Sequence, residues 1–158
     1  MILVADDEPG LREIVRVNLE AEGYRVLEAA DGIEALQAVE QAHPDLLILD
    51  IAMPRLDGWQ VLHRLEAQPA TAGLPVLVLT ARASEEDVLR GLEEGAVQYI
   101  TKPFYPEDLV ASVKIVLNVF SSQMREQYRR QLIAKRRKLV EQWPQIYWPG
   151  AESSQSGT

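Results

Sequence analysis

The stretch DLLILDIAMPRLDGWQVL, residues 45–62, contains the pattern on which the predicted fold depends. Four aliphatic residues in a row, 46–49, are typical of a strand that is buried on both faces of a parallel sheet. Asp50 follows this strand directly, and the loop after it leads to apolar residues at helical spacing, Val61 and Leu65 among them. The stretch therefore predicts a buried strand, a charged strand end and a helix, in that order.

The same alternation of strand and helix extends over the first 120 residues. Strand starts lie about 20 to 30 residues apart, which is the length of one strand with its crossover helix. The predicted strands are Ile2–Ala5, Arg25–Ala29, Leu46–Leu49, Val76–Leu79 and Gln98–Ile100. Five such units predict an α/β fold, a doubly wound parallel sheet with helices on both faces.

Length and composition limit the chain to one globular domain with an appendage. It has 158 residues, of which 47% are hydrophobic and 25% charged, and it lacks cysteine, which excludes disulfides and thiolate-bound zinc. The longest aliphatic runs are too short to span a bilayer, and acidic residues follow the N-terminus too closely for a secretory signal. We therefore expect a cytoplasmic protein that does not contact a membrane.

The net charge of −8 is divided unevenly along the chain. Residues 1–120 carry 21 acidic and 9 basic side chains, a net −12, whereas residues 121–158 carry 7 basic and 3 acidic side chains, a net +4. An acidic body repels nucleic acid, and a basic tail attracts phosphate or an acidic partner. The charges therefore predict two parts, a domain over 1–120 and a basic extension over 121–158.

Polar and charged residues end four of the five predicted strands. They are Asp6, Asp7 and Glu8 after the first strand, Asp50 after the third, Thr80 after the fourth, and Thr101 and Lys102 after the fifth. Taken singly, each has another explanation, because acidic residues also cap helices and aspartate is common in turns. Ligands of open parallel sheets bind beyond the carboxyl ends of the strands, so the combination favours a functional site.

The carboxylates of Asp6, Asp7 and Asp50 would converge if the first and third strands are neighbours, as in the flavodoxin-like order 2-1-3-4-5. Two carboxylates ~4 Å apart repel by about 4 kcal/mol at an effective dielectric constant of ~20, so the cluster would bind protons or a cation. Oxygen ligands without histidine or cysteine suit Mg²⁺ or Mn²⁺. With Lys102 and Thr80 as phosphate-binding groups, these are the parts needed for phosphoryl transfer to an aspartate.

Four stretches of the sequence resemble the receiver domain of bacterial two-component response regulators, over roughly residues 1–120. They are ILVADDEPGLREIV (2–15), DLLILDIAMPRLDGWQVL (45–62), PVLVLTA (75–81) and GAVQYITKPF (95–104). Each stretch alone is weakly specific, whereas the combination in register is highly specific. The resemblance implies the flavodoxin-like strand order 2-1-3-4-5. It also implies a signalling switch that assists its own phosphorylation and dephosphorylation, and not an enzyme.

The resemblance further implies a role for each residue of the acidic cluster. Asp50 would accept a phosphoryl group from a sensor histidine kinase or a histidine phosphotransfer protein. Mg²⁺, or alternatively Mn²⁺, would be bound by Asp7 directly, by Asp6 through water, by Asp50, and by the backbone carbonyl of Ala52.

By the same resemblance, Thr80 and Lys102 would bind the phosphoryl oxygens, and a cis bond between Lys102 and Pro103 would fix the approach of the lysine. Tyr99 would be the aromatic switch, which turns inward as Thr80 is drawn toward the phosphate. The surface expected to change comprises the helix at about 84–94, the fifth strand and the last helix.

The region after Pro106 has no proline or glycine before Pro144, and its apolar residues recur at helical spacing. This pattern predicts one long helix over 106–142, which would be about 55 Å long if it were straight. Its far half would then pair with a second copy, dock on a partner, or fold back through a break. Residues 151–158 are expected to be disordered.

The output of the switch is less defined by the sequence. Many DNA-binding members dimerise through an acidic pair and basic residues that this chain lacks. We expect instead an apolar homodimer through the last helix, formed by Val113, Val116, Val119 and Phe120. Direct DNA binding is not expected, because no helix-turn-helix or winged-helix stretch follows.

The alternative functions are a phosphotransfer intermediate in a phosphorelay, or a fragment of a larger regulator without its output domain. A metal-dependent hydrolase fits less well, because no acid/base partner is predicted beside Asp50.

Overall fold

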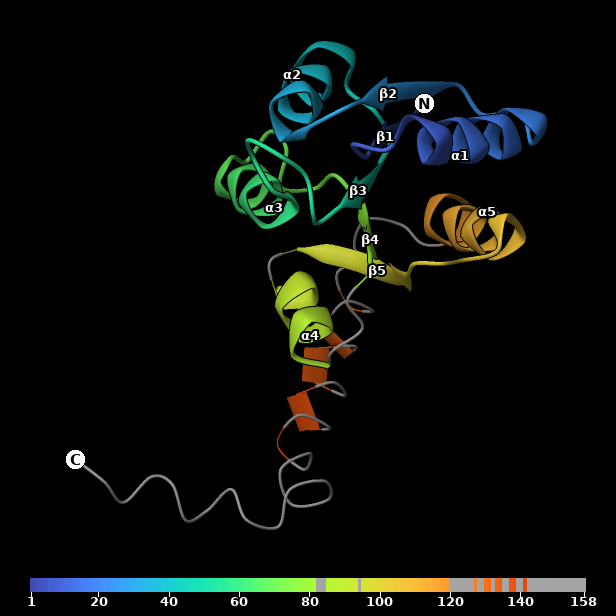
Figure 1. Cartoon of the computed structure of the whole chain (residues 1–158). Coiled ribbons are helices and arrows are strands. Elements are labelled where there is room, and N and C mark those ends of the chain that lie inside the picture. The colour runs from blue at the N-terminus through green and yellow to red at the C-terminus, as the bar shows by residue number, and fades with distance from the viewer. Residues whose placement is uncertain are drawn as a thin grey trace.

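The computed structural model describes most of the chain (Figure 1). It covers residues 1–81, 85–93 and 95–119, with only the backbone for 85–88 and 119. Eight further positions are described, namely Gln127, Arg130, Gln131, Ile133, Ala134, Arg137, Lys138 and Glu141. The expected disordered end at 151–158 lies outside the described residues.

A five-stranded parallel sheet forms the centre of the molecule, in the order β2-β1-β3-β4-β5. The strands are β1 (Ile2–Ala5), β2 (Val26–Ala29), β3 (Leu46–Asp50), β4 (Val76–Thr80) and β5 (Ala96–Thr101). The predicted flavodoxin-like order is confirmed. Strands β3, β4 and β5 extend further than predicted. Part of the extension runs through polar residues that no hydrophobic pattern marks, such as Thr80 paired with Thr101, and β5 also starts two residues earlier, at Ala96, which pairs with Val76. Strand β2 starts one residue later than predicted.

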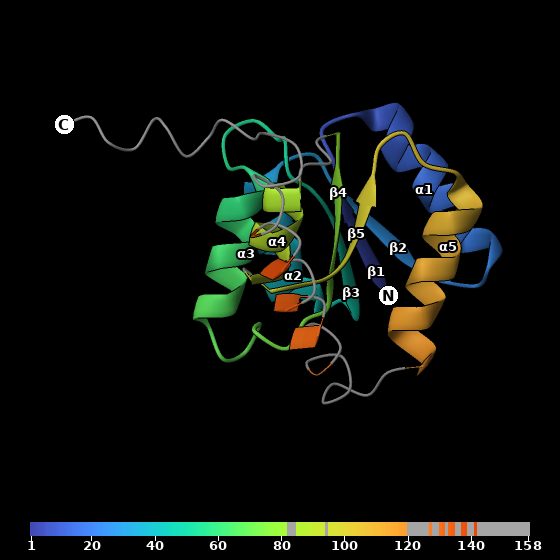
Figure 2. The same ribbon diagram turned by 90° about the horizontal axis from the view of Figure 1, so that it is seen from below.

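Helices cover both faces of the sheet, as Figure 2 shows. They are α1 (Pro9–Ala21), α2 (Gly32–Ala42), α3 (Gly58–Ala67), α4 (Glu85–Glu93) and α5 (Pro106–Lys114), and α5 continues as a π-helical stretch over Ile115–Val119. Helices α1 and α5 lie on one face of the sheet, and α2, α3 and α4 lie on the other. None of the helices in the described part of the chain is long and apolar enough to cross a membrane.

The central position of strand β3 explains why residues 46–49 are all aliphatic. Leu47 and Leu49 point into the core beneath α2 and α3, whereas Leu46 and Ile48 point into the core beneath α1 and α5. All four side chains are fully buried. Because successive side chains of a strand alternate between faces, a central strand covered on both faces needs an apolar residue at every position.

The loop after β3 folds back tightly against the end of the strand. A Cβ atom on Gly58 would lie 2.6 Å from the carbonyl oxygen of Asp50, so only glycine fits at the start of α3. Asp57 caps this helix, since its carboxylate accepts the backbone N–H of Gln60 and the Gln60 side chain returns to the Asp57 N–H. The close approach at Gly58 and the cap by Asp57 together fix the start of α3 next to Asp50.

The last helix packs into its own domain through two of the four residues expected to form a homodimer. Val113 and Val116 are buried in the core with Leu109, against α1 and the sheet. The prediction that Val113 and Val116 form an intermolecular seam is therefore wrong, because their side chains are not available to a second copy. The side chain of Val119 and all of Phe120 lie outside the described residues.

The described residues between 127 and 141 include one that contacts the domain. Arg137 forms an ion pair with Glu93, the last residue of α4, and Figures 1 and 2 place the described residues of this segment beside α4. Of the three arrangements left open by the sequence, this contact agrees with the one that folds back. The predicted helix over 106–142 runs partly through residues outside the described part.

Candidate functional site

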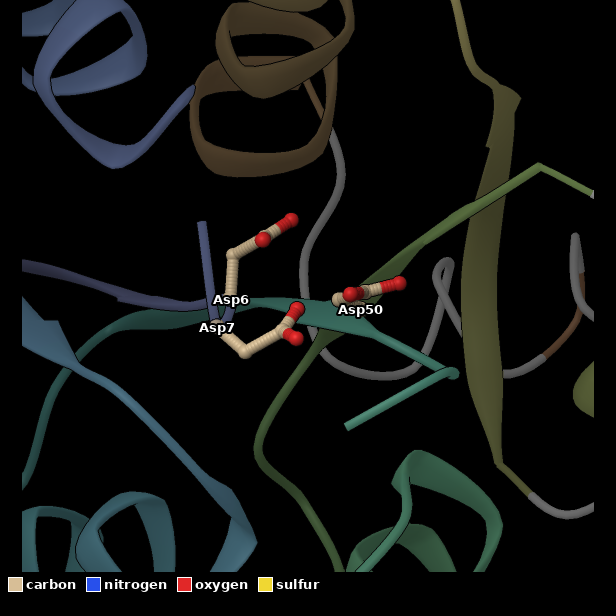
Figure 3. Close-up of side chains that lie close together, drawn as sticks. All are labelled: Asp6, Asp7 and Asp50. Carbon is tan, nitrogen blue, oxygen red and sulfur yellow. The ribbon is translucent and has the colours of Figure 1, made fainter. Parts of the chain in front are cut away.

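Three aspartates meet at the carboxyl edge of the sheet (Figure 3). Asp6 and Asp7 follow β1, Asp50 ends β3, and the two strands are hydrogen-bonded neighbours. Their carboxylates each offer an oxygen within 4.8 Å of the others. Asp6 and Asp50 are buried and Asp7 is exposed, so the cluster has two inner carboxylates and one that faces solvent. The predicted convergence of Asp6, Asp7 and Asp50 is confirmed.

Lys102 joins the two buried carboxylates. Its Nζ lies 2.7 Å from Oδ2 of Asp6 and 3.4 Å from Oδ2 of Asp50. The lysine follows β5, and its backbone N–H donates to the carbonyl oxygen of Thr80 at 2.7 Å. The predicted cis bond between Lys102 and Pro103 is present. Residues from β1, β3, β4 and β5 therefore meet at one point.

Burial and charge shift the ionisation of Asp50. The pKa of Asp50 is raised from 3.8 to about 6, mainly by burial and then by the negative charge of Asp6, while the positive charge of Lys102 and the hydrogen bond from Ala52 act to lower it. For Lys102, burial acts to lower the pKa, but the hydrogen bond to Asp6 and the charges of Asp50 and Asp6 outweigh it and raise the pKa. The site therefore combines one basic side chain with three acidic ones, and this excess of acidic groups favours a cation.

Backbone groups bind the remaining oxygens of the buried carboxylates. The N–H of Ala52 donates to Oδ1 of Asp50 at 3.2 Å, and the N–H of Glu8 donates to Oδ1 of Asp6 at 2.8 Å. Ala52 therefore lies in the loop that folds over Asp50, next to the cluster. Its predicted role as a carbonyl ligand stays a prediction.

Thr80 and Tyr99 come from the two strands beside the cluster. Thr80 ends β4 next to Asp50 of β3, and it is buried. Tyr99 lies on β5, is half-buried, and packs against the core beneath α2 and α3. The structure thus brings Thr80 to the predicted edge. The predicted motion of Tyr99 stays a prediction.

Sequence reasoning missed two pairs that hold the loops around the aspartates. The first is Arg12 of α1, whose Nη1 donates to the carbonyl oxygen of Asp6 at 2.6 Å and whose Nε lies 3.3 Å from Oε1 of Glu28. The second is Arg55, in the loop after Asp50, which forms an ion pair with the buried Asp31 at the start of α2. A signal for Arg12 was available, because side chains in the first turn of a helix lean toward its N-terminus and hence toward this loop.

The donor set fits a hard divalent cation. All three side chains offer carboxylate oxygens, and no histidine belongs to the cluster, which suits Mg²⁺ or Mn²⁺ better than zinc. Two of the carboxylates are already fixed by hydrogen bonds from Lys102, Ala52 and Glu8. The arrangement is able to hold a cation and a phosphoryl group at the same point.

Comparisons with known proteins agree with this geometry. The family model for the response regulator receiver domain matches residues 2–114. The DNA-binding dual master transcriptional regulator RpaA of Synechocystis is 42% identical over 73% of this chain and 48% of its own length. The phosphate regulon transcriptional regulatory protein PhoB of Escherichia coli is 44% identical over 76% of this chain and 52% of its own length. The chain thus spans about half the length of these regulators.

Solved structures give the same result. The receiver domain of a signal transduction histidine kinase from Syntrophus aciditrophicus has a TM-score of 0.70 and 36% identity, over 76% of this chain and 91% of that one. The chemotaxis protein CheY4 of Vibrio cholerae has a TM-score of 0.70 and 35% identity, over 73% of this chain and 97% of that one. The likeness therefore extends over nearly the whole of these domains.

Proposed function

This chain belongs to the family of response regulator receiver domains, and from that premise we propose that it is a phosphorylation-dependent switch of a two-component system whose phosphoacceptor is Asp50. The phosphoryl donor is a phosphohistidine, on a sensor histidine kinase or a histidine phosphotransfer protein. Asp6, Asp7, Asp50 and the backbone carbonyl of Ala52 hold Mg²⁺, which neutralises charge on the transferred phosphoryl group when it is bound.

The observation that carries this proposal is the position of Lys102 between Asp6 and Asp50, at 2.7 and 3.4 Å. A pKa of about 6 leaves the carboxylate of Asp50 mostly ionised at neutral pH, as a nucleophile must be. One of its oxygens attacks the phosphorus of the phosphohistidine, the P–N bond breaks, and the imidazole keeps the electron pair and takes up a proton. Lys102 is close enough to Asp50 to bind an oxygen of the transferred group.

The two remaining site residues link the chemistry to the surface. Thr80, buried at the end of β4 beside Asp50, donates its hydroxyl to a phosphoryl oxygen. Tyr99 on the adjacent strand turns inward as Thr80 moves, and α4, β5 and α5 change their outer surface. Phosphorylation adds roughly one to two negative charges to the site, so Lys102 and the cation are needed to make the phosphorylated state stable.

Asp50→Asn tests the assignment of the phosphoacceptor. We expect this variant to take up no phosphoryl group from acetyl phosphate and Mg²⁺, because an amide lacks the nucleophilic oxygen anion. Intact-protein mass spectrometry measures the uptake. The matched control is Asp45→Asn, which changes an exposed carboxylate at the opposite end of the same strand, 68% exposed and paired with the N-terminal amine. Full labelling of Asp50→Asn would contradict the proposal.

The output is proposed to be a change in assembly or in protein partner. Direct DNA binding by residues 1–120 is disfavoured by their net charge of −12, although RpaA is named a DNA-binding regulator. A homodimer through the last helix would have to use its outer face, where Ile115 is 49% exposed, since Val113 and Val116 are buried. The alternative functions for the chain are a relay intermediate and the receiver part of a larger regulator.

We expect the switch to act in the cytoplasm.

A further inference from the structure

The peptide bond between Asp6 and Asp7 is held by a side chain that lies outside the acidic cluster. Nη1 of Arg12 donates to the carbonyl oxygen of Asp6 at 2.6 Å, and this oxygen belongs to the peptide that joins the two aspartates. Because a peptide unit is planar, fixing its oxygen also fixes the direction in which the chain enters Asp7. The contact therefore acts on the geometry of Asp7 through the backbone.

Asp7 depends on its backbone more than its two neighbours do. Asp6 is held by Lys102 and by the N–H of Glu8, and Asp50 by Lys102 and the N–H of Ala52. Within the described part of the chain, the side chain of Asp7 has no hydrogen bond or ion pair of its own. The aim of this carboxylate toward Asp50 (Figure 3) is thus set mainly by the peptide that precedes it.

Arg12 is itself held in place from the sheet. Its side chain is only 15% exposed, and its Nε lies 3.3 Å from Oε1 of Glu28. Glu28 is on β2, paired in register with Val4 of β1, so the guanidinium is fixed by a strand that cannot move independently of the cluster. The planar fork of arginine allows one side chain to reach the Asp6 carbonyl and Glu28 together.

We propose that Arg12 is a positioning residue that sets the affinity of the site for a divalent cation, by orienting the Asp6–Asp7 peptide, with Glu28 holding Arg12 in place. The proposal rests on the proposed function only in taking the three aspartates as the cation site. The direction in which cation affinity changes when Arg12 is removed distinguishes this role from a purely electrostatic one. As a mere nearby positive charge, Arg12 would weaken cation binding, so its removal would strengthen binding; as a positioning residue, its removal weakens binding.

Mn²⁺ binding to the full chain, measured by the electron paramagnetic resonance signal of the free ion, tests the proposal. We expect Arg12→Ala to weaken Mn²⁺ binding by about tenfold, as is usual for side chains that orient metal ligands. The matched control is Arg16→Ala, because Arg16 also pairs with Glu28, at 3.4 Å, but within the described part of the chain it contacts only Glu28 and Glu20 through ion pairs and does not reach the Asp6 carbonyl. We expect this control to leave Mn²⁺ binding unchanged or slightly tighter.

A second variant keeps the test valid if Arg12→Ala fails to fold. Arg12→Lys retains the charge but lacks the planar fork, so it should also bind Mn²⁺ more weakly than the wild type while melting at a similar temperature without metal. If both Arg12 variants bind Mn²⁺ as tightly as Arg16→Ala, or more tightly, the proposal is overturned. A wild type that binds Mn²⁺ but takes no label on Asp50 would contradict the proposed function and leave the role of Arg12 standing.

Discussion

The acidic edge of the sheet and the segment after α5 both contain an ion pair, but the two pairs have different surroundings. At the sheet edge, Lys102 is 15% exposed and Asp6 is fully buried. In the C-terminal segment, Arg137 is 58% exposed and its partner Glu93 on α4 is 40% exposed. Breaking a buried pair leaves an uncompensated charge and costs several kcal/mol, whereas an exposed pair contributes about 0–1 kcal/mol.

The difference indicates what each region is able to do. The sheet edge places its charges at the ends of three strands, β1, β3 and β5, which belong to one hydrogen-bonded sheet and are therefore fixed relative to one another, so its geometry is suited to chemistry. The C-terminal segment meets α4 through a solvated contact that water and salt compete with. A contact of this kind is easily released, which agrees with the proposal that the outer surface of α4 changes on phosphorylation.

The largest effect on stability is expected for Lys102→Ala. Without divalent cations, this variant leaves the buried Asp6 beside Asp7 and Asp50 with no compensating charge, and we expect the free energy of unfolding to fall by about 3 kcal/mol. Urea unfolding at neutral pH measures the loss, and added Mg²⁺ should restore part of it.

The control for that variant is Lys114→Ala. Lys114 has an equally short ion pair, with its Nζ 2.6 Å from Oε2 of Glu22, but both side chains are exposed. We expect only a minor loss of stability from this substitution. Equal losses in Lys102→Ala and Lys114→Ala would mean that burial does not distinguish the two regions.

A smaller effect is expected from pH, measured without metal. The pKa of Asp50 is raised from 3.8 to about 6 in the folded chain, so between these pH values the folded chain binds a proton at Asp50 that the unfolded chain has lost. The contribution of Asp50 to the free energy of unfolding therefore falls as the pH rises through the raised pKa. The complete loss is at most about 3 kcal/mol. Asp50→Asn lacks this titration, so its stability relative to the wild type should grow by roughly 1–2 kcal/mol between about pH 5 and about pH 7.5. A constant difference between the two proteins would show that the pKa of Asp50 is not raised.

The smallest effect is expected at the C-terminal segment. Arg137→Glu places two like charges together, and we expect it to lower the free energy of unfolding by less than about 1 kcal/mol at low salt and by less at high salt. The double variant that exchanges the two charges, Glu93→Arg with Arg137→Glu, should regain the lost stability, as measured by thermal unfolding. Failure of the exchange to restore it would place the effect of Arg137 somewhere other than Glu93.

The predictions from sequence succeeded where a repeating pattern determines the structure. The run 46–49 has no polar position, which only a strand covered on both faces requires, and parallel strands bring Asp6, Asp50 and Lys102 to one edge whatever the loops do. Strand ends were less accurate, because Thr80 is held by pairing with Thr101 and not by hydrophobicity.

The predictions failed where the same pattern has two meanings, or where no pattern exists. An apolar stripe on a helix faces either its own core or another chain, and Val113 and Val116 face the core. The contacts of Arg12 with Asp6 and Glu28 depend on how helix α1 is rotated against the sheet. The place of Arg12 in the first turn of α1 indicates that its side chain leans toward the loop after β1, but the partners that it reaches follow from packing over the whole domain, which residue spacing does not encode.

The central claim is that Asp50 carries the phosphoryl group, and locating the group tests it most directly. Borohydride reduces an aspartyl phosphate to homoserine, so peptide mass spectrometry of the wild type treated with acetyl phosphate identifies the modified position. We predict homoserine at position 50, formed when Mg²⁺ is present and absent when it is chelated. Homoserine at Asp6, Asp7 or elsewhere in place of position 50, or equal conversion without a divalent cation, would contradict the account.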